Sequence, residues 1–280
     1  MSKEPNGALF QSFLPLGEEA RTHVWKFSWQ YGGRRPRHFH AEPELNLIVA
    51  GSAKFGVGQE VISASKGDLL GFPPGQDHVL LETSSDLYLF AIGVEPKLSE
   101  SVLRKDRAAA MTPLHVRLSH SDFKALTKRA EVVVDRSGID HLGAELWEHA
   151  NWVRSQDANR WRSPMHVLTR KVLALMMDDS QLSRDDLARY VRAAPSAISR
   201  YFHHDLGLPL VQYRMRLRLM HYIRLMDAKM ANLTTAAKLA GFGSYSQCHR
   251  VFQSELGCSP RQFFYSATRE QMQRVYDPEL

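Results

Sequence analysis

The chain changes its hydrophobic pattern between its first and last thirds. From about Val24 to Val94, short apolar runs recur about every ten residues, separated by glycine and proline. The runs cover residues 23–29, 45–49, 53–57, 68–72, 78–81 and 88–94. Short strands at this spacing predict a small β-barrel or sandwich.

Helical spacing replaces this pattern from residue 120 onward. Residues 120–154 have apolar positions three and four apart and predict two helices. Residues 209–227 predict one long helix whose apolar positions alternate with arginines. At about 1.5 Å per residue this helix is about 28 Å long, close to the roughly 34 Å turn of B-DNA that separates successive major grooves on one face.

A duplicated pattern flanks that long helix. Phe202–Gly207 and Phe252–Gly257 both read as Phe, two polar residues, an acid, Leu and Gly, fifty positions apart. Each closes a unit that predicts two short helices joined by a tight turn, the helix-turn-helix arrangement whose second helix enters the major groove. One such unit is a weak signal, because many helical bundles contain a similar pair. The duplication predicts two matching DNA-reading units.

Helix-start signals support both units. In the first, Ser183 and Asp186 form a capping-box pattern, and Pro195 opens the second helix. In the second, Asn232 and Ser244 precede the two helices as predicted N-caps. The second helix of each unit presents hydroxyl, amide and guanidinium groups outward, which suit hydrogen bonding to base edges. The predicted DNA-binding residues are Ser196, Ser199, Arg200, His203, Ser244, Tyr245, Ser246, Gln247, His249 and Arg250.

Charge agrees with this assignment. The chain has 36 Lys and Arg against 30 Asp and Glu. Residues 1–165 contain 20 of each sign, so the whole excess of +6 lies in residues 166–280. A basic segment that coincides with helix-turn-helix units is expected for phosphate contact, although a solvated basic helical face would give the same count.

The C-terminal third resembles the DNA-binding domain of the AraC/XylS family of bacterial transcription regulators over about residues 167–268. The matching residues are Arg200-Tyr201-Phe202, Leu206-Gly207, Gly241-Phe242, Ser244, Ser246, Arg250, Phe252, Gly257 and Ser259-Pro260. The resemblance implies double-stranded DNA as a partner, and RNA polymerase as a further partner if the protein is an activator. The helices of residues 120–154 could pack on the barrel or against a second copy, and the resemblance favours a homodimer formed through them. Two positions depart from the family pattern: Cys248 replaces a core aromatic or Leu, and Ala194 replaces a capping Ser.

Two histidine-containing motifs lie in the N-terminal half. Positions two apart on a strand share a face, so His38 and His40 can converge, with Glu44 from the same edge and His78 from a neighbouring strand. Three imidazoles and a carboxylate make a plausible first shell for a divalent Fe, Mn, Ni, Zn or Cu ion. The alternative is that the imidazoles only line a polar pocket or bond across strands.

These motifs, with Gly32, Gly51, Gly67 and Pro73-Pro74-Gly75, resemble both conserved motifs of the cupin superfamily; Glu82 replaces the customary Asn. A cupin barrel has room for one small ligand, here an unidentified effector. The predicted effector-pocket residues are Trp25, Phe27, Trp29, Phe55, Phe72 and Phe90, unless these aromatics are plain core. Arg34, Arg35 and Arg37 either attract an anionic ligand or form a solvated loop.

The predicted fold class is therefore α+β with two domains. We expect an N-terminal arm (1–20), a cupin-like sensor barrel (21–97), a helical dimerisation or connector region (98–156), a linker (157–166), an all-α double helix-turn-helix domain (167–268) and a C-terminal tail (269–280). No apolar stretch approaches the length of a membrane span, and two cysteines, Cys248 and Cys258, make neither a metal set nor a disulfide framework. A cytoplasmic location is the simple expectation.

The predicted function is a sequence-specific DNA-binding transcription regulator that is not an enzyme and whose cupin-like domain senses a small molecule. The main alternative is a metal-dependent cupin oxygenase or isomerase with an accessory DNA-binding module. A third alternative is a nucleoid-coating protein without a ligand, which would have weak sequence preference.

Overall fold

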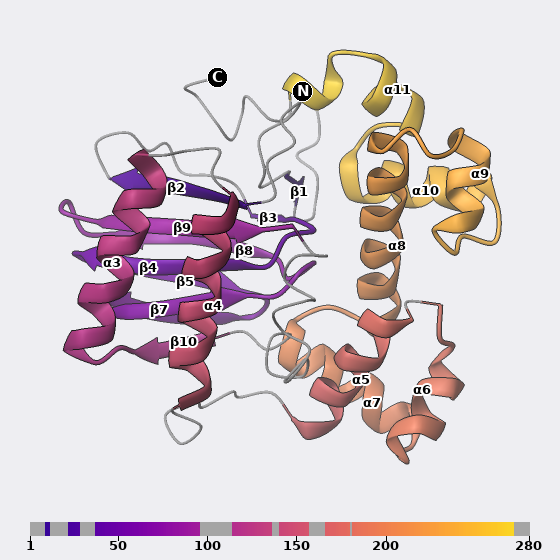
Figure 1. Cartoon of the computed structure of the whole chain (residues 1–280). Coiled ribbons are helices and arrows are strands. Elements are labelled where there is room, and N and C mark those ends of the chain that lie inside the picture. Colours follow the sequence, from indigo (N-terminus) through magenta and orange to yellow (C-terminus); the bar gives the residue numbers. More distant parts are fainter. Residues whose placement is uncertain are drawn as a thin grey trace.

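The computed structural model describes residues 9–11, 22–28, 37–95, 114–135, 140–156, 166–179 and 181–271. Two five-stranded sheets form the N-terminal part, and a helical domain lies beside them (Figure 1). One sheet has the strand order β1-β3-β8-β5-β6, and the other has the order β10-β7-β4-β9-β2. The predicted α+β architecture, with cupin-like sheets followed by a helical domain, is confirmed.

The strands match the predicted apolar runs closely. Their bounds are β1 Leu9–Phe10, β2 Thr22–Ser28, β3 His38–Phe39, β4 Glu44–Ala50, β5 Ser52–Val57, β6 Glu60–Ser65, β7 Asp68–Phe72, β8 His78–Thr83, β9 Tyr88–Val94 and β10 Leu114–Arg117. The apolar pattern missed β1, β3, β6 and β10. Strand β6 carries polar or exposed side chains at most positions, because one of its edges has no neighbouring strand among the described residues.

Helices α3 (His120–Asp135) and α4 (Asp140–Gln156) cross the outer face of the β10-β7-β4-β9-β2 sheet (Figure 1). Their apolar sides join one core cluster with residues from β4, β9 and β2, including Leu47, Phe90 and Val24. The opposite face of the same sheet contributes residues such as Ile48 and Leu89 to a second cluster between the sheets. Because successive side chains of a strand point to opposite faces, this one sheet contributes residues to two cores.

The helical domain contains both predicted units. Its helices are α5 Val167–Asp178, α6 Arg184–Val191, α7 Pro195–Leu206, α8 Leu210–Asp227, α9 Leu233–Leu239, α10 Tyr245–Leu256 and α11 Pro260–Tyr265. Helix α8 is the predicted long helix, and its 18 residues rise about 27 Å. It runs along the boundary between the helical domain and the sheets (Figure 1). None of the described helices is long and apolar enough to cross a bilayer.

The prediction of a loose N-terminal arm is wrong for residues 9–11. Strand β1 pairs in parallel with β3, and Gln11 N donates to Phe39 O at 2.9 Å. The Phe10 ring is buried between Phe39 and Phe263, at centroid distances of 5.8 and 6.4 Å. Burial of this aromatic ring holds the segment against both domains. The predicted linker, apart from its last residue, lies outside the described residues.

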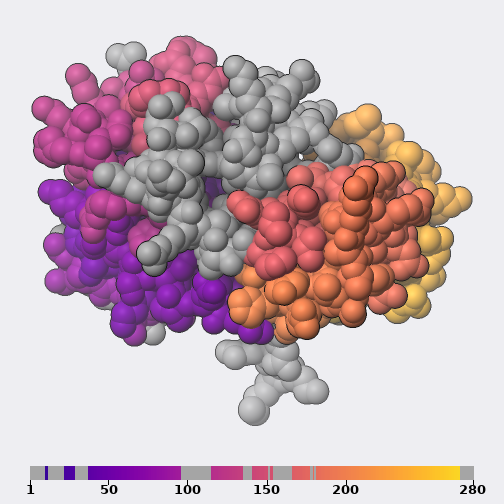
Figure 2. Space-filling model, turned by 90° about the horizontal axis from the view of Figure 1, so that it is seen from below, coloured from indigo at the N-terminus to yellow at the C-terminus, as the bar shows by residue number. Residues whose placement is uncertain are grey.

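The two domains pack directly on each other. Phe10 and Phe39 belong to the same buried cluster as the core of the helical domain. A Cβ added at Gly207, which follows α7, would lie 2.7 Å from Gln59 N in the turn between β5 and β6. Figure 2 shows the purple surface of the sheets meeting the orange surface of the helical domain. The histidine motifs therefore lie in a domain that contacts the helical domain.

Candidate functional site

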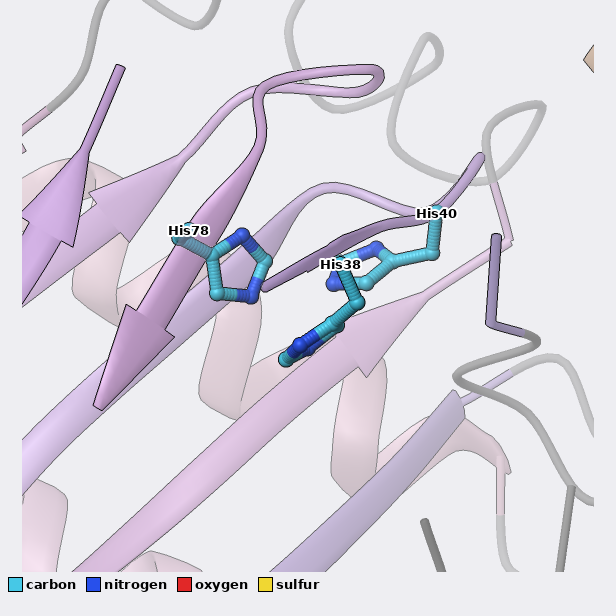
Figure 3. Close-up of side chains that lie close together, drawn as sticks. All are labelled: His38, His40 and His78. Atoms are coloured by element: carbon cyan, nitrogen blue, oxygen red, sulfur yellow. The ribbon is translucent and has the colours of Figure 1, made fainter. Parts of the chain in front are cut away.

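The three motif histidines converge in one buried cluster (Figure 3). His38 on β3 is the register partner of His78 on β8, and His40 follows directly after β3. One ring nitrogen from each lies within 4.8 Å of one from each of the others. The ring centroids of His38 and His78 are 4.4 Å apart, and those of His40 and His78 are 5.2 Å apart. The predicted convergence is therefore present.

Glu44 completes the cluster from the opposite sheet. It is the first residue of β4, whereas the histidines belong to the sheet that contains β3 and β8. Its Oε2 lies 2.7 Å from His40 Nε2 and 3.2 Å from His78 Nε2. Its Oε1 accepts a hydrogen bond from Asn46 Nδ2 at 2.7 Å. The carboxylate thus bridges the two sheets at the point where the histidines meet.

Backbone carbonyls orient two of the rings. His40 Nδ1 donates to Glu42 O at 2.7 Å, and His78 Nδ1 donates to Gln76 O at 3.1 Å. Both Nε2 atoms are thereby turned toward Glu44. His78 Nε2 is buried and faces Glu44 Oε2 without a hydrogen bond to it. Fixing one ring nitrogen and leaving the other directed inward is the arrangement that metal-binding histidines use.

Burial and charge set the protonation of this pair. Burial alone lowers the pKa of His40, but the hydrogen bond and charge of Glu44, assisted by Glu42, outweigh it, so that pKa is raised. Burial alone raises the pKa of Glu44, but attraction to His78 and the hydrogen bond from His40 hold that pKa well below its usual value. The ion-free site therefore favours a charged His40 beside a carboxylate. A divalent cation would displace the proton from His40 Nε2.

The predicted pocket aromatics fall into different places. Phe72 stacks on the His78 ring at a centroid distance of 4.4 Å, and Phe55 lies 5.8 Å from Phe72. Phe27 packs against the same cluster between the sheets. Phe90 is a correction: it belongs to the core beneath α3 and α4, because it lies on the outer face of β9. Trp25 is half-buried beside His23, at a centroid distance of 4.2 Å, and Trp29 lies outside the described residues.

Arg37 has a structural partner. Its guanidinium contacts Asp77 Oδ2 at 2.8 Å and donates to Gly58 O at 3.2 Å. The reading of this arginine as part of a solvated loop is therefore corrected, because an acid that is distant in sequence holds it; Arg34 and Arg35 lie outside the described residues. Glu82, which departs from the cupin pattern, pairs with Lys54 on the exposed surface.

The helices of both units begin where the sequence predicted. Ser183 and Asp186 form the complete capping box of α6, and Ser244 Oγ accepts from Gln247 N at the start of α10. Helix α7 begins with Pro195 after Ala194, which offers no side-chain cap. Helix α7 therefore lacks a capping hydrogen bond that α10 has.

Seven of the ten predicted DNA-binding residues have exposed side chains, and the other three are half-buried. Ser199 Oγ donates to Pro195 O within its own helix at 3.0 Å. Gln247 Oε1 accepts from Gly243 N at 2.8 Å, which leaves its amide NH2 group available. Tyr245 lies near His249, with ring centroids 6.3 Å apart. The exposed residues are Ser196, Arg200, His203, Ser244, Ser246, His249 and Arg250.

Comparison with known proteins identifies both domains. A family described as a helix-turn-helix domain matches residues 187–266, and a family described as a cupin domain matches residues 25–92. The two matches place a helix-turn-helix domain and a cupin domain in one DNA-binding regulator. The regulator binds DNA through the helical domain. No curated protein sequence matches the chain.

Solved structures similar to the regulator include ToxT from Vibrio cholerae O395, with 15% identity over 87% of this chain and 96% of that chain and a TM-score of 0.48. An unsaturated fatty acid-bound ToxT from Vibrio cholerae strain SCE256 is 12% identical over 87% of this chain and 94% of that chain, with a TM-score of 0.47. The AraC-like transcriptional activator CuxR is 13% identical over 79% and 78% of the two chains, with a TM-score of 0.35.

Sequence reasoning missed the contacts that join the two domains of the regulator. Tyr213 Oη donates to Pro74 O at 2.8 Å, and Arg216 Nη1 contacts Asp77 Oδ1 at 3.1 Å. A signal was present, because Arg216 lies at helical spacing between the apolar residues Tyr213 and Met220. An arginine on an apolar helix face predicts a buried partner, although the spacing alone does not tell which acid it meets.

Proposed function

We propose that the two recognition helices, α7 and α10, read consecutive major grooves and that a ligand in the cupin domain biases how they engage DNA. The observation that supports this most strongly is the loop of residues 73–78, which carries His78 and hydrogen-bonds to α8 between the two units. A ligand can shift the DNA-competent population only as far as its affinity differs between the two arrangements. Because the two domains are in direct contact, a change in the cupin domain on ligand binding can alter the position of the helical domain.

Within the DNA interface, hydroxyl, amide and guanidinium groups on α7 and α10 supply sequence readout, and surrounding arginines supply salt-dependent affinity. Helix α10 contributes more in this proposal, because Ser244 caps its start. RNA polymerase as a partner and a homodimer through α3 and α4 remain proposals of the same kind. Exposed Trp152 and Val132 lie on those two helices.

The cupin domain would hold a divalent metal through His38, His40, Glu44 and His78. The donor set of imidazole nitrogen and carboxylate oxygen suits Fe, Mn, Ni, Zn or Cu. The inward-facing Nε2 of His78, which lies 3.2 Å from Glu44 Oε2, fits a ligand to such an ion. A bound cation would supply a Lewis-acidic centre for an oxygen donor of the effector. Phe27, Phe55 and Phe72 would offer the apolar side of its pocket.

DNA selection tests the first part. Full-length protein is incubated with sheared genomic fragments at moderate salt, and bound fragments are sequenced. We expect enrichment of a small set of promoter segments, which then serve as defined duplexes. Uniform recovery would contradict the proposal and would favour the nucleoid-coating alternative. Lys54→Ala, which removes one charge from the exposed sheet, serves as a control that should leave enrichment unchanged.

Metal titration tests the second part. Protein freed of metal is titrated calorimetrically with Zn²⁺, Mn²⁺ or Co²⁺, one ion at a time. We expect about one ion per chain for at least one of them, and loss of that binding in His78→Ala. His115→Ala removes a histidine of the same domain that pairs with Asp68 outside the cluster, and it should bind as wild type does. Equal stoichiometry in both variants would contradict a site at His78.

The enzymatic alternative predicts a different result. A cupin oxygenase or isomerase would consume oxygen or convert a substrate in the metal-loaded state without DNA. A regulator would instead show a ligand-dependent change in DNA affinity. Oxygen uptake measured beside DNA binding on the same preparation therefore separates the two, and turnover that His78→Ala abolishes would favour the enzyme.

A further inference from the structure

Arg216 is the buried charge at the junction of the two domains. Its side chain is 4% exposed, and it contacts acids on both sides of the junction. Nη1 lies 3.1 Å from Asp77 Oδ1 of the cupin domain, and Nε lies 3.1 Å from Glu255 Oε2 near the end of α10. One guanidinium thus ties the cupin domain to the second recognition helix. Its planar fork of donors allows both contacts at once.

The cupin side of this contact belongs to the histidine site. Asp77 immediately precedes His78, and Arg216 Nη1 also lies 3.4 Å from Gly75 O. Gly75 N donates to His40 O at 2.9 Å, so the same loop is attached to a second site histidine. The Arg216 guanidinium lies 4.3 Å from the centre of the Phe39 ring. Phe39 is the residue between His38 and His40 in the sequence. A displacement of either histidine therefore reaches Arg216 through one or two contacts.

The helical side of this contact belongs to DNA reading. Glu255 lies in the last turn of α10, the helix that carries Ser246, Gln247 and Arg250 at its start. Anchoring the far end of a short helix sets the angle at which its start can enter a groove. Gln212 Nε2 also donates to Glu255 Oε1 at 3.1 Å, so α8 holds this acid by two side chains.

We propose that Arg216 is a positioning residue that couples the histidine site to the orientation of α10. This inference rests on the proposed function, in which α10 reads DNA and the cupin domain receives a ligand. When the loop of residues 73–78 shifts, Arg216 changes its balance between Asp77 and Glu255, and α10 moves with it. Thermodynamic linkage makes the effect reciprocal, so DNA binding must also alter the loop.

Hydrogen exchange on the full-length protein tests the reciprocal effect without any metal. Exchange at the amides of residues 75–78, the non-proline part of this loop, is measured with and without a duplex obtained by genomic selection. In wild-type protein we expect DNA to change the exchange rate of this loop by roughly 5-fold or more, the lower end of ordinary allosteric coupling. In Glu255→Gln, which removes the negative charge that Arg216 meets on α10, we expect the change to fall to near 1-fold.

The choice of variants keeps the outcome interpretable. Glu255→Gln leaves Arg216 paired with Asp77, so the junction stays occupied. Arg216→Met is the second variant, and in it Asp77 keeps Arg37 at 2.8 Å while Glu255 keeps Gln212. Arg224→Met, at an exposed position of α8, should couple as wild type does. Thermal unfolding of each variant shows that the fold is retained.

Three results would overturn the inference. If the wild-type protein selects DNA but DNA does not change exchange in the loop, the coupling is excluded while the proposed function is retained. Full coupling in Glu255→Gln would also exclude the Arg216 route. A protein that selects no DNA overturns the proposed function and this inference together, so the two failures are distinguishable.

Discussion

The two helix-turn-helix units share a sequence pattern but differ in how the rest of the molecule holds them. In the first unit, Asp205 accepts from His166 N at 2.8 Å, just before the first helix of the same domain. In the second, the equivalent acid, Glu255, contacts Arg216 and through it the cupin domain. A repeated motif therefore predicts the repeated elements, whereas the partners of its acids depend on what packs beside each copy.

The first unit contacts the cupin domain in a different way, through its backbone. Gly207 has φ of 72° and fits against Gly58 and Gln59 so closely that a Cβ there would meet backbone atoms at 2.7 to 2.9 Å. The equivalent Gly257 has φ of 69° and nothing within 4 Å of an added Cβ. One copy thus has a tight backbone junction, and the other has a side-chain junction that can rearrange.

The largest expected effect comes from breaking the backbone junction. Gly207→Ala should cost about 1–2 kcal/mol for left-handed backbone and about 1–3 kcal/mol more for the clash with Gln59. Gly257→Ala should cost only the first contribution, because its Cβ enters open space. Urea unfolding of the full chain measures both. Equal losses would mean that the two domains do not pack at Gly207 in solution.

The next largest expected effect is a loss of DNA affinity when an arginine of either unit is removed. Arg250→Ala should weaken binding to a selected duplex by about 1–3 kcal/mol if Arg250 meets a guanine. Arg200→Ala should cost less, because Arg200 lies over the Tyr201 ring at 5.0 Å on a helix without a side-chain cap. Fluorescence anisotropy on selected and scrambled duplexes separates the two kinds of contact. A loss that is the same on both duplexes would assign Arg250 to phosphate.

Removing the N-cap of α10 and adding one to α7 should reduce the difference in stability between the first turns of these two helices. Ser244→Ala removes the acceptor for Gln247 N and should cost about 0.5–2 kcal/mol of stability. Ala194→Ser adds an acceptor at the uncapped start of α7, whose backbone is already extended, and should stabilise it by a similar amount. Helix amide exchange at the first turn of each helix reports both changes. Unchanged exchange in Ala194→Ser would mean that Pro195 already suffices.

Much of this fold could be predicted from local pattern. The runs at residues 68–72 and 88–94 are strands with the predicted bounds, because each is apolar and ends at a turn. Helix α8 begins one residue after the predicted start, since Pro209 occupies its N-cap. The histidine cluster was also within reach, because the spacing of His38, His40 and His78 matches a known motif.

The remaining features depend on distant contacts that no local pattern carries. Phe90 could not be placed beneath α3 and α4 until those helices were known to cover the outer face of its sheet. Residues 9–11 look irregular because two residues form a strand only when a partner edge is present. The junction at Arg216 joins positions about 140 residues apart, between Asp77 and Arg216. The charge of Arg216 alone does not predict which of the thirty acidic residues it contacts.

The smallest expected effect is a pH dependence of helix stability that α6, the first helix of the first unit, has and α9, the first helix of the second unit, lacks. Ser183, through its hydroxyl and backbone, and then Arg189 lower the pKa of Asp186, which completes the capping box of α6. A lowered folded pKa means that this contribution is present above the unfolded value of about 3.9 and is lost as pH falls through the folded value. The equivalent cap of α9 is Asn232, which does not titrate. Amide exchange between pH 5 and about 3.5 should therefore loosen α6 relative to α9, and Asp186→Asn should remove that difference; an acid response that persists in Asp186→Asn would locate it elsewhere.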